Sequence, residues 1–180
     1  MGEGTDEELM HQFFQGDPGA FNALFDRHAP AVHSFLTRMV RNRQLADDLL
    51  QTTFLSVVRS RGRFEAPDRV LPWFLSIAAN AARDAMRRHS NRNEELTATG
   101  QMPESSEGET LSDPVLRRRL EAALDTLPPE QKEVVLLHLV QGWSFEDIAQ
   151  SHQLNAATVR VRAHRGLKKL RALLGHLGEA

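Results

Sequence analysis

Over most of the 180-residue chain, apolar residues recur three or four positions apart, and no stretch alternates apolar with polar residues. The 3.6-residue period is that of helices with one buried side, whereas alternation would indicate strands. Thr5 and Glu8 have the spacing of a capping box, and Pro30 and Pro72 suit the first turn of a helix. The sequence therefore predicts an all-α protein, with helices in its N-terminal half at residues 5–15, 18–28, 30–41, 44–60 and 71–89.

The helical pattern stops between Asn93 and Asp113. This segment holds six acids, no Lys or Arg and few large apolar residues, a composition typical of disordered linkers. Periodic apolar spacing resumes at Val115. The chain is therefore predicted to consist of two small helical domains, 1–92 and 114–180, joined by a flexible acidic linker at 93–113.

The C-terminal part of the chain has the spacing of a helix-turn-helix motif. Two prolines begin a predicted helix in "LPPEQKEVVLLHLVQG", and Gly142 is expected to end it. Ser144 then has the place of a cap for a short helix, and Asn155 that of a cap for a longer helix running to about Leu174. A helix, a tight turn and a longer last helix are therefore predicted.

The last predicted helix separates apolar residues from cations. Its buried stripe is expected to consist of Val159, Ala163, Leu167, Leu170 and Leu174. The opposite side carries no acid, and the candidate DNA contacts on it are Thr158, Arg160, Val161, Arg162, His164, Arg165 and Lys168. In a helix-turn-helix the second helix enters the major groove, where its first half meets base edges and its basic flanks meet phosphates. The alternative is a solvated basic face that only keeps the protein soluble.

Two kinds of side chain on this helix have a specific chemistry toward bases. Arg160 or Arg165 can donate two hydrogen bonds to a guanine, whereas Val161 offers only apolar contact, for example with a thymine methyl group. Base reading is therefore expected from the arginines.

The helix predicted at 44–60 has an unusual outward side, on which apolar residues are interleaved with polar ones: Asp47, Asp48, Gln51, Leu55 and Val58. Such a mosaic on a rigid helix is typical of a protein-binding surface. The alternative is that Leu55 and Val58 pack against a neighbouring helix of the same domain. The helical wheel leaves these two interpretations equally open.

The helix predicted at 71–89 has a polar stripe formed by Ser76, Asn80, Arg83 and Arg87, with Trp73 adjacent and Arg88 following. Its apolar side is predicted to hold Phe74, Ile77, Ala78, Ala81 and Ala85. Asn and Arg can hydrogen-bond bases or phosphates, and an aromatic ring can stack on an unpaired base. The Pro-containing segment "RFEAPDRVLP" precedes the stripe, and a loop in this place can capture a base. The alternative for Trp73 is a place in the core.

Composition limits the possible functions. The chain has no Cys, which excludes disulfides and thiolate chemistry. No apolar run reaches the ~18 residues of a membrane span, and the acidic N-terminus is unlike a signal peptide, so we expect a cytoplasmic protein without membrane insertion. There is no phosphate-binding glycine loop, and His28 and His33 would diverge on a helix. The sequence thus predicts no catalytic residues, no metal site and no cofactor.

Taken together, these motifs resemble the bacterial extracytoplasmic-function (ECF) sigma factors, members of the sigma-70 family that have only domains two and four. The segment "DDLLQTTFLSV" resembles the polymerase-binding helix of that family. The segment "RFEAPDRVLPWFLSIAANAARDAMRR" resembles its promoter-melting and minus-ten region. The segment "LPPEQKEVVLLHLVQGWSFEDIAQSHQLNAATVRVRAHRGLKKLR" resembles domain four, which reads the minus-thirty-five element.

The resemblance implies a protein without catalysis that binds core RNA polymerase, directs it to a promoter and melts the promoter. Contact with polymerase is implied for Asp48, Gln51 and Leu55, beside Asp47 and Val58. Contact with melted minus-ten DNA is implied for Phe64, Trp73, Asn80, Arg83, Arg87 and Arg88. Contact with the duplex minus-thirty-five element is implied for Arg160, Val161, His164 and Arg165. Control by an anti-sigma factor is also implied.

The sequence departs from the family pattern at three positions. Thr52 stands where the family often has an acid, Val161 where a small polar residue is common, and Ala163 where a larger apolar residue is common. The second hypothesis is a stand-alone helix-turn-helix regulator that binds duplex DNA without polymerase, and the third is an enzyme. The mosaic and the Trp/Asn/Arg stripe favour the sigma factor, because a protein that binds only duplex DNA needs neither.

Overall fold

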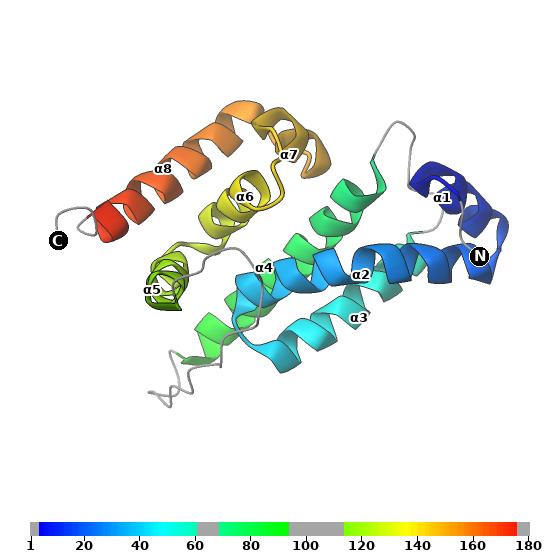
Figure 1. Ribbon diagram of the computed structural model, residues 1–180, viewed down its shortest axis with the longest axis horizontal. Coiled ribbons are helices and arrows are strands. Elements are labelled where there is room, and N and C mark those ends of the chain that lie inside the picture. Colours follow the sequence, from blue (N-terminus) through cyan, green and yellow to red (C-terminus); the bar gives the residue numbers. More distant parts are fainter. Residues whose placement is uncertain (1–3, 61–68, 94–113, 176–180) are drawn as a thin grey trace. The chain divides into compact units, whose positions relative to one another are not determined.

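The computed structural model describes residues 4–60, 69–93 and 114–175 (Figure 1). The chain divides into two compact units, Met1–Arg88 and His89–Ala180. The described part is helical and contains no strand, which confirms the all-α prediction. None of its helices is long and apolar enough to cross a membrane. They are α1 (Asp6–Gln15), α2 (Pro18–Val40), α3 (Arg43–Arg59), α4 (Val70–Asn93), α5 (Pro114–Asp125), α6 (Pro129–Leu139), α7 (Phe145–Ser151) and α8 (Ala156–Leu174).

Helix α2 runs without a break through Pro30, so the prediction of two helices that meet at this proline is wrong. Buried residues lie on both sides of Pro30 along the helix: Leu24, His28, Val32 and Phe35. Pro30 itself is exposed, so the carbonyl that loses its helical partner can bond to water. The packing of one continuous buried side therefore outweighs the local cost of the proline.

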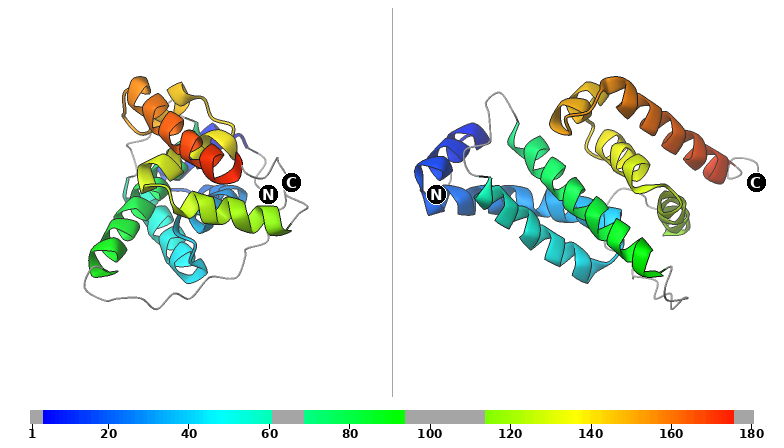
Figure 2. Two further views of the ribbon diagram at one scale, coloured as in Figure 1. Left: turned by 90° about the vertical axis from the view of Figure 1, so that its left-hand side faces the viewer. Right: turned by 180° about the vertical axis from the view of Figure 1, so that it is seen from behind.

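An aromatic cluster joins α2, α3 and α4, which lie side by side in the first unit (Figure 2). The ring centroid of Phe54 in α3 lies 6.2 Å from that of Phe21 and 4.7 Å from that of Phe25, both in α2. It lies 5.4 Å from that of Phe74 in α4. Edge-to-face ring pairs at these distances are favourable. Because Phe54 points into this cluster, the opposite side of α3 faces outward.

The buried side of α4 is rotated from the predicted one, although Phe74 and Ala78 are fully buried as predicted. Three residues expected inside are only half-buried: Ile77, Ala81 and Ala85. Three residues that were not expected there are fully buried: Leu75, Ala79 and Ala82. Ser76, predicted on the outward polar stripe, is buried as well, and its hydroxyl donates to the carbonyl of Trp73 (2.8 Å). Since α4 has small apolar residues on most of its sides, the helical wheel alone does not define the buried one.

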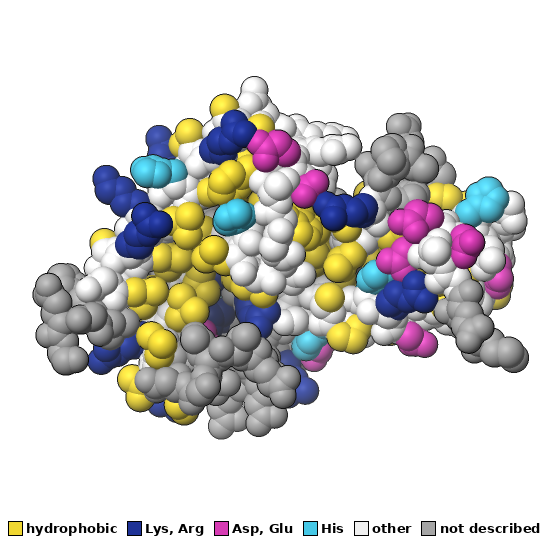
Figure 3. Space-filling model, turned by 45° about the horizontal axis from the view of Figure 1, so that its top comes forward, with side chains coloured by type: hydrophobic (Ala, Val, Ile, Leu, Met, Phe, Trp, Pro, Cys, Tyr) yellow, Lys and Arg dark blue, Asp and Glu magenta, His cyan; other side chains and the backbone are white. Residues whose placement is uncertain are grey.

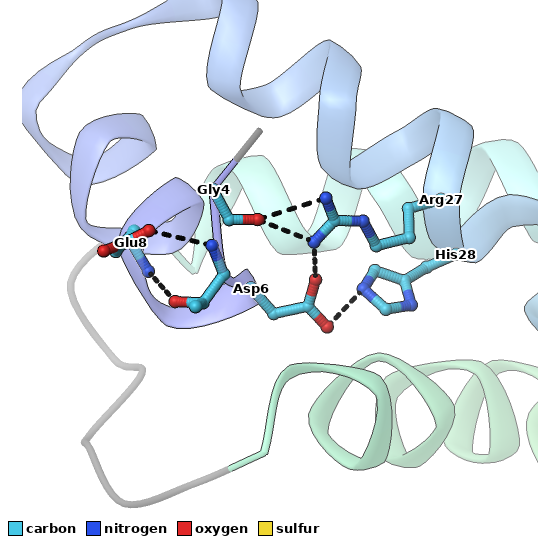
Figure 4. A network of polar contacts seen from close by, with 6 residues as sticks. Gly4, Asp6, Glu8, Arg27 and His28 are labelled. Atoms are coloured by element: carbon cyan, nitrogen blue, oxygen red, sulfur yellow. Dashed lines mark hydrogen bonds and ion pairs between the residues drawn. The ribbon is translucent and has the colours of Figure 1, made fainter. Parts of the chain in front are cut away.

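The first turn of α1 has the predicted capping box (Figure 4). The N–H of Thr5 donates to Glu8 Oε2 (2.8 Å), and the N–H of Glu8 donates to Thr5 Oγ1 (3.2 Å). From α2, Arg27 donates to the carbonyl oxygen of Gly4 (3.1 Å) and to Asp6 Oδ1 (2.6 Å). These contacts fasten the start of α1 to α2.

His28 lies beside this contact and is buried. Its Nε2 is 2.8 Å from Asp6 Oδ2, and its ring meets that of Phe74 edge to face at 5.6 Å. Burial lowers the pKa of His28, although the Asp6 carboxylate acts in the opposite direction. A neutral imidazole therefore links α1, α2 and α4 at neutral pH.

Helix α6 is the central helix of the second unit. Four consecutive residues are buried: Val134, Val135, Leu136 and Leu137. Because consecutive positions point in different directions, α6 is covered on most sides, and α7 and α8 both pack against it. In α8, Gly166 lies so close to α6 that an added Cβ would be 2.9 Å from Val135 Cγ2. The glycine thus lets the two helices approach closely.

Two charged residues of α6 are also buried, and each has a partner. Lys132 Nζ donates to Asp125 Oδ1 at the end of α5 (2.9 Å). Glu133 Oε1 lies 2.5 Å from Nε2 of His152, the residue that directly follows α7. Buried charges persist in proteins when they are paired. These two pairs tie α6 to α5 and α7.

Candidate protein-binding and nucleic-acid-binding surfaces

The first candidate surface is the outward side of α3, here named the mosaic face, which consists of Asp47, Asp48, Gln51, Leu55 and Val58. All five side chains are exposed. Solvent reaches 56% of Leu55 and 41% of Val58, so the alternative that these two residues pack within the domain is wrong. Two large aliphatic side chains exposed among acids form a surface suited to a protein partner.

Helix α3 presents the mosaic face because its inward side is fixed by buried residues: Ala46, Leu49, Thr53, Phe54 and Val57. Its N-terminus is capped by Asn42, whose Oδ1 accepts from the N–H of Leu45 (2.9 Å). From α2, His33 Nε2 lies 2.8 Å from Asp47 Oδ1. The hydroxyl of Thr52 donates back to the carbonyl of Asp48 (2.9 Å). The mosaic face is thus held on a rigid support, and Asp47 is the acid whose position a second helix sets.

The second candidate surface is the polar side of α4. Asn80, Arg87 and Arg88 are exposed, and Arg83 is half-buried. Arg83 donates to Asn80 Oδ1. Arg87 donates to Asp84 Oδ1 (2.9 Å), and Arg88 Nε donates to the Asp84 carbonyl (3.2 Å). The sequence reasoning missed Asp84, whose carboxylate orients Arg87, although the i, i+3 spacing of this pair was a usable signal.

Trp73 and Phe64 were also predicted to face melted DNA. Trp73 is half-buried, with its ring centroid 5.7 Å from that of Phe74, so it is neither a core residue nor a fully exposed one. Ser76 does not belong to the polar side of α4, because it is buried. Phe64 and most of the loop from Phe64 to Leu71 lie outside the described residues.

The third candidate surface belongs to the predicted helix-turn-helix, which α7 and α8 form. The N–H of Asp147 donates to Ser144 Oγ (3.0 Å), and the N–H of Ser144 donates to Asp147 Oδ2 (3.3 Å), so the cap of α7 is confirmed. Asn155 caps α8, as predicted. The preceding helix α6 ends at Leu139 rather than at Gly142, which adopts a left-handed φ of 70° three residues later.

The outward side of α8 is here named the groove face, and its exposed members are Thr158, Arg160, Val161, His164, Arg165 and Lys168. Figure 3 shows Lys, Arg and His side chains over α8, with hydrophobic side chains exposed between them. Val161 is 48% exposed, and Arg162 is half-buried at the edge of the face. Of the predicted buried stripe, Val159, Ala163 and Leu170 are buried, while Leu167 and Leu174 are half-buried. Gly166 completes the buried side.

Two cations of α8 have partners that the sequence reasoning missed. Arg160 forms an ion pair with Glu146 in the first turn of α7. Lys169 donates to the carbonyl oxygen of Thr126, directly after α5. Lys169 thus ties α8 to the end of α5, whereas Lys168 lies exposed on the groove face. Both pairs join residues far apart in the sequence, so no local spacing signals them.

Comparison with known proteins finds two matching family models. The model of sigma-70 region 2 matches residues 24–92, and the model of sigma-70 region 4 matches residues 117–170. RNA polymerase sigma factor CarQ of Myxococcus xanthus is 51% identical over 174 residues, which cover 93% of this chain and 97% of that protein. ECF RNA polymerase sigma factor SigM of Mycobacterium tuberculosis is 31% identical over 175 residues, which cover 97% and 87% of the two chains.

Two solved structures have a similar fold. The structure of CnrH in complex with the cytosolic domain of CnrY matches with a TM-score of 0.71 at 24% identity, over 95% of this chain and 97% of that one. The sigma factor RpoE in complex with the anti-sigma factor NepR from Bartonella quintana matches with a TM-score of 0.70 at 21% identity, over 86% and 96% of the two chains.

Two helical units, one with an aliphatic and acidic face and one with a basic helix-turn-helix, define a DNA-binding protein that also docks on a protein partner. The chain belongs to the ECF sigma factors of the sigma-70 family. It is therefore a non-enzymatic initiation factor that binds core RNA polymerase and directs it to promoter DNA. The predictions of family, of function and of a protein without catalysis are confirmed.

Proposed function

We propose that the two units of this sigma factor divide promoter recognition between them. Residues 1–92 bind core polymerase and hold melted minus-ten DNA, residues 114–180 read the duplex minus-thirty-five element, and residues 93–113 connect them. The matches of region 2 to residues 24–92 and of region 4 to residues 117–170 support these boundaries. The observation that carries the proposal is the exposure, in one chain, of an aliphatic and acidic helix face and of a basic one.

The mosaic face is the proposed polymerase contact. Leu55 and Val58 supply apolar area that solvent would otherwise cover, while Asp48 and Gln51 supply charge and hydrogen bonds at its rim. Interface energy concentrates in central apolar residues that become desolvated. Leu55, the more exposed aliphatic residue, is therefore the proposed anchor.

The polar side of α4 is the proposed contact with melted minus-ten DNA. Asn80 offers an amide that can pair with the edge of an unstacked base, and Arg87 and Arg88 offer cations to the backbone. Trp73 keeps part of its ring accessible, which permits stacking on a base. Phe64 and Arg83 complete the proposed set.

The groove face of α8 is the proposed reader of the minus-thirty-five element. Arg160 and Arg165, both exposed, are proposed to meet base edges, and Val161 to meet a thymine methyl group. Thr158 and His164 lie beside them, while Arg162 and Lys168 are the proposed phosphate contacts.

A transcription assay with purified core polymerase tests the proposal. Promoter-specific initiation that depends on this chain supports a sigma factor with the two described contacts. The second hypothesis from the sequence, a helix-turn-helix regulator that works without polymerase, is excluded by the family of the chain. The mosaic face agrees with this, because a protein that binds only duplex DNA has no use for exposed aliphatic residues in its other unit.

We also propose that an anti-sigma factor controls the protein and that it works in the cytoplasm, where core polymerase and promoter DNA are found. The similarity in fold to the sigma factor RpoE, which was solved in complex with the anti-sigma factor NepR, supports such control. An anti-sigma factor that covers the mosaic face would compete with polymerase. Expressing the product of the neighbouring gene and measuring its competition with core polymerase for this chain tests this, and simultaneous binding of both would contradict it.

A further inference from the structure

The contact between Glu146 and Arg160 places a carboxylate on the DNA-facing motif. Glu146 lies in the first turn of α7, Arg160 lies in the first half of α8, and the two side chains are 61% and 58% exposed. Helix α8 itself contains no acid. A carboxylate at this point repels the phosphates of an approaching duplex. Its presence therefore calls for a compensating role.

Local stability supplies only a small part of that role, because the helix dipole stabilises an exposed acid in the first turn of a helix only weakly. The capping of α7 is done by Ser144 and Asp147, so Glu146 is not needed for it. An exposed ion pair adds little to the stability of a fold, because solvent screens it and two long side chains lose their freedom. The main effect of the contact is therefore to fix the position of the Arg160 guanidinium.

A carboxylate on one side of a guanidinium leaves its other N–H groups in a defined direction. Guanidinium has five N–H donors in a rigid plane, and reading guanine takes two of them. A side chain that is already held loses less rotamer freedom when it meets the base. A guanidinium that is neutralised by Glu146 is also a weaker ligand for phosphate, which every DNA sequence offers equally.

We propose that Glu146 is a specificity-determining residue, which positions Arg160 for a base of the minus-thirty-five element and withholds it from phosphates. The inference rests on the proposed role of the groove face in reading that element. It adds that a residue of α7, outside the groove face, sets how strongly the chain prefers its own promoter over other DNA.

Glu130 provides a matched control for the charge of Glu146. It is exposed and occupies the second position of α6, as Glu146 does in α7. Glu146→Ala and Glu130→Ala therefore remove the same charge from the same place in two helices of one unit. Only the first removes a partner of Arg160.

The experiment measures binding of holoenzyme, made from core polymerase and the full chain, to two duplexes. One carries an upstream element that the wild-type holoenzyme selects from a randomised pool, and the other carries a scrambled element. For Glu146→Ala we expect the ratio of the two affinities to fall about fivefold or more. We also expect binding to the scrambled duplex to rise and its dependence on log salt to steepen by about one. Glu130→Ala should leave the ratio unchanged.

The double variant Glu146→Ala with Arg160→Ala separates positioning from a general charge effect. If Glu146 acts through Arg160, its removal changes the ratio no further once Arg160 is absent. An unchanged ratio in Glu146→Ala, or an equal fall in the Arg160→Ala background, overturns the inference alone. A wild-type holoenzyme that does not distinguish the two duplexes overturns the proposed role of the groove face, and the inference with it.

Discussion

The mosaic face of α3 and the groove face of α8 have the same construction and opposite charge. Each is the outward side of a helix whose inward side is buried, and each carries an exposed aliphatic residue, Leu55 in α3 and Val161 in α8. Leu55 lies among acids and an amide, whereas Val161 lies among arginines and a histidine. The charge around the aliphatic residue, rather than the helix itself, thus distinguishes the surface proposed for polymerase from the surface proposed for DNA.

The two faces are also held in similar ways. A neighbouring helix orients one charged residue on each: His33 of α2 contacts Asp47, and Glu146 of α7 contacts Arg160. In both cases the partner has the opposite charge or can acquire it. Each unit therefore sets the direction of one side chain that is proposed to contact a partner, which would reduce the ordering cost of binding.

The largest effect is expected on polymerase binding, when an aliphatic residue of the mosaic face is replaced by an acid. Leu55→Asp places a carboxylate where an interface needs apolar area, so we expect affinity for core polymerase to fall about 100-fold or more. Because Leu55 is exposed, the helix content should stay that of the wild type. Titration of labelled protein with core polymerase measures the first quantity, and far-ultraviolet circular dichroism measures the second.

Thr52→Asp is the matched control, because it adds the same charge to α3 one turn from Asp48. The family often has an acid at this position, so polymerase binding should be unchanged or stronger. A similar loss in both variants would mean that added charge, and not the removal of an aliphatic anchor, explains the result. Loss of helix content in Leu55→Asp would contradict its exposed position.

The second prediction divides the groove face into residues that read bases and residues that bind phosphate. Arg165→Ala should cost about 1 to 3 kcal/mol at the selected promoter and much less at a scrambled one. Lys168→Ala should weaken binding to both duplexes by the same factor and reduce the slope of log affinity against log salt by about one. Lys169 is unsuitable for this comparison, because its contact with the Thr126 carbonyl links two helices. If Arg165→Ala lowers the affinity for both duplexes equally, Arg165 does not read a base.

The third prediction concerns the support of the groove face. Gly166→Ala forces a methyl group to within 2.9 Å of Val135 Cγ2, an overpacking cost of about 1 to 3 kcal/mol. A gain in helix propensity of about 1 kcal/mol offsets part of it, so we expect a net loss in the free energy of unfolding of about 1 kcal/mol. Gly175→Ala, which has open space around it, should cause no loss. Equal denaturation midpoints for the two variants would contradict the close approach of α8 and α6.

Features that depend on neighbours in the sequence could be predicted. The caps at Thr5, Ser144 and Asn155 rest on spacings of two or three residues, and the structure has them all. The outward face of α8 could be predicted as well, because that helix has one distinct apolar stripe. For α3 the helical wheel left open whether Leu55 and Val58 pack within the domain, and only their exposure in the structure decides it.

Features that depend on tertiary packing could not be predicted. Pro30 reads as a helix start, and only the buried residues on both sides of it keep α2 continuous. The buried side of α4 was predicted only in part, at Phe74 and Ala78, because small apolar residues lie on most sides of that helix. The pairs Arg160 with Glu146 and Lys169 with Thr126 join positions 14 and 43 residues apart. No periodicity in the sequence reports such contacts.

The smallest effect is expected from pH, and it concerns the unit that carries the mosaic face. Burial lowers the pKa of His28 below its ordinary value of 6.5, while Asp6 opposes the shift. At pH values between the pKa of His28 in the folded chain and its ordinary pKa, the unfolded chain binds more protons than the folded one. In this range the free energy of unfolding therefore rises with pH. The stability of this unit should therefore fall as the pH drops below about 6.5, and stop falling below the folded pKa.

Replacing the titrating ring separates this effect from other ionisations. His28→Gln removes the buried imidazole, so its loss of stability between about pH 7 and pH 5 should be smaller than that of the wild type. His11→Gln, an exposed position in α1, should keep the wild-type profile. Thermal unfolding at several pH values measures the profiles, and hydrogen exchange in α2 assigns them to the first unit. If His28→Gln loses as much stability as the wild type on acidification, the buried neutral imidazole is not what makes this unit sensitive to pH. The buried imidazole would then not distinguish the first unit from the second, and the difference between them would lie in the charge of their exposed faces.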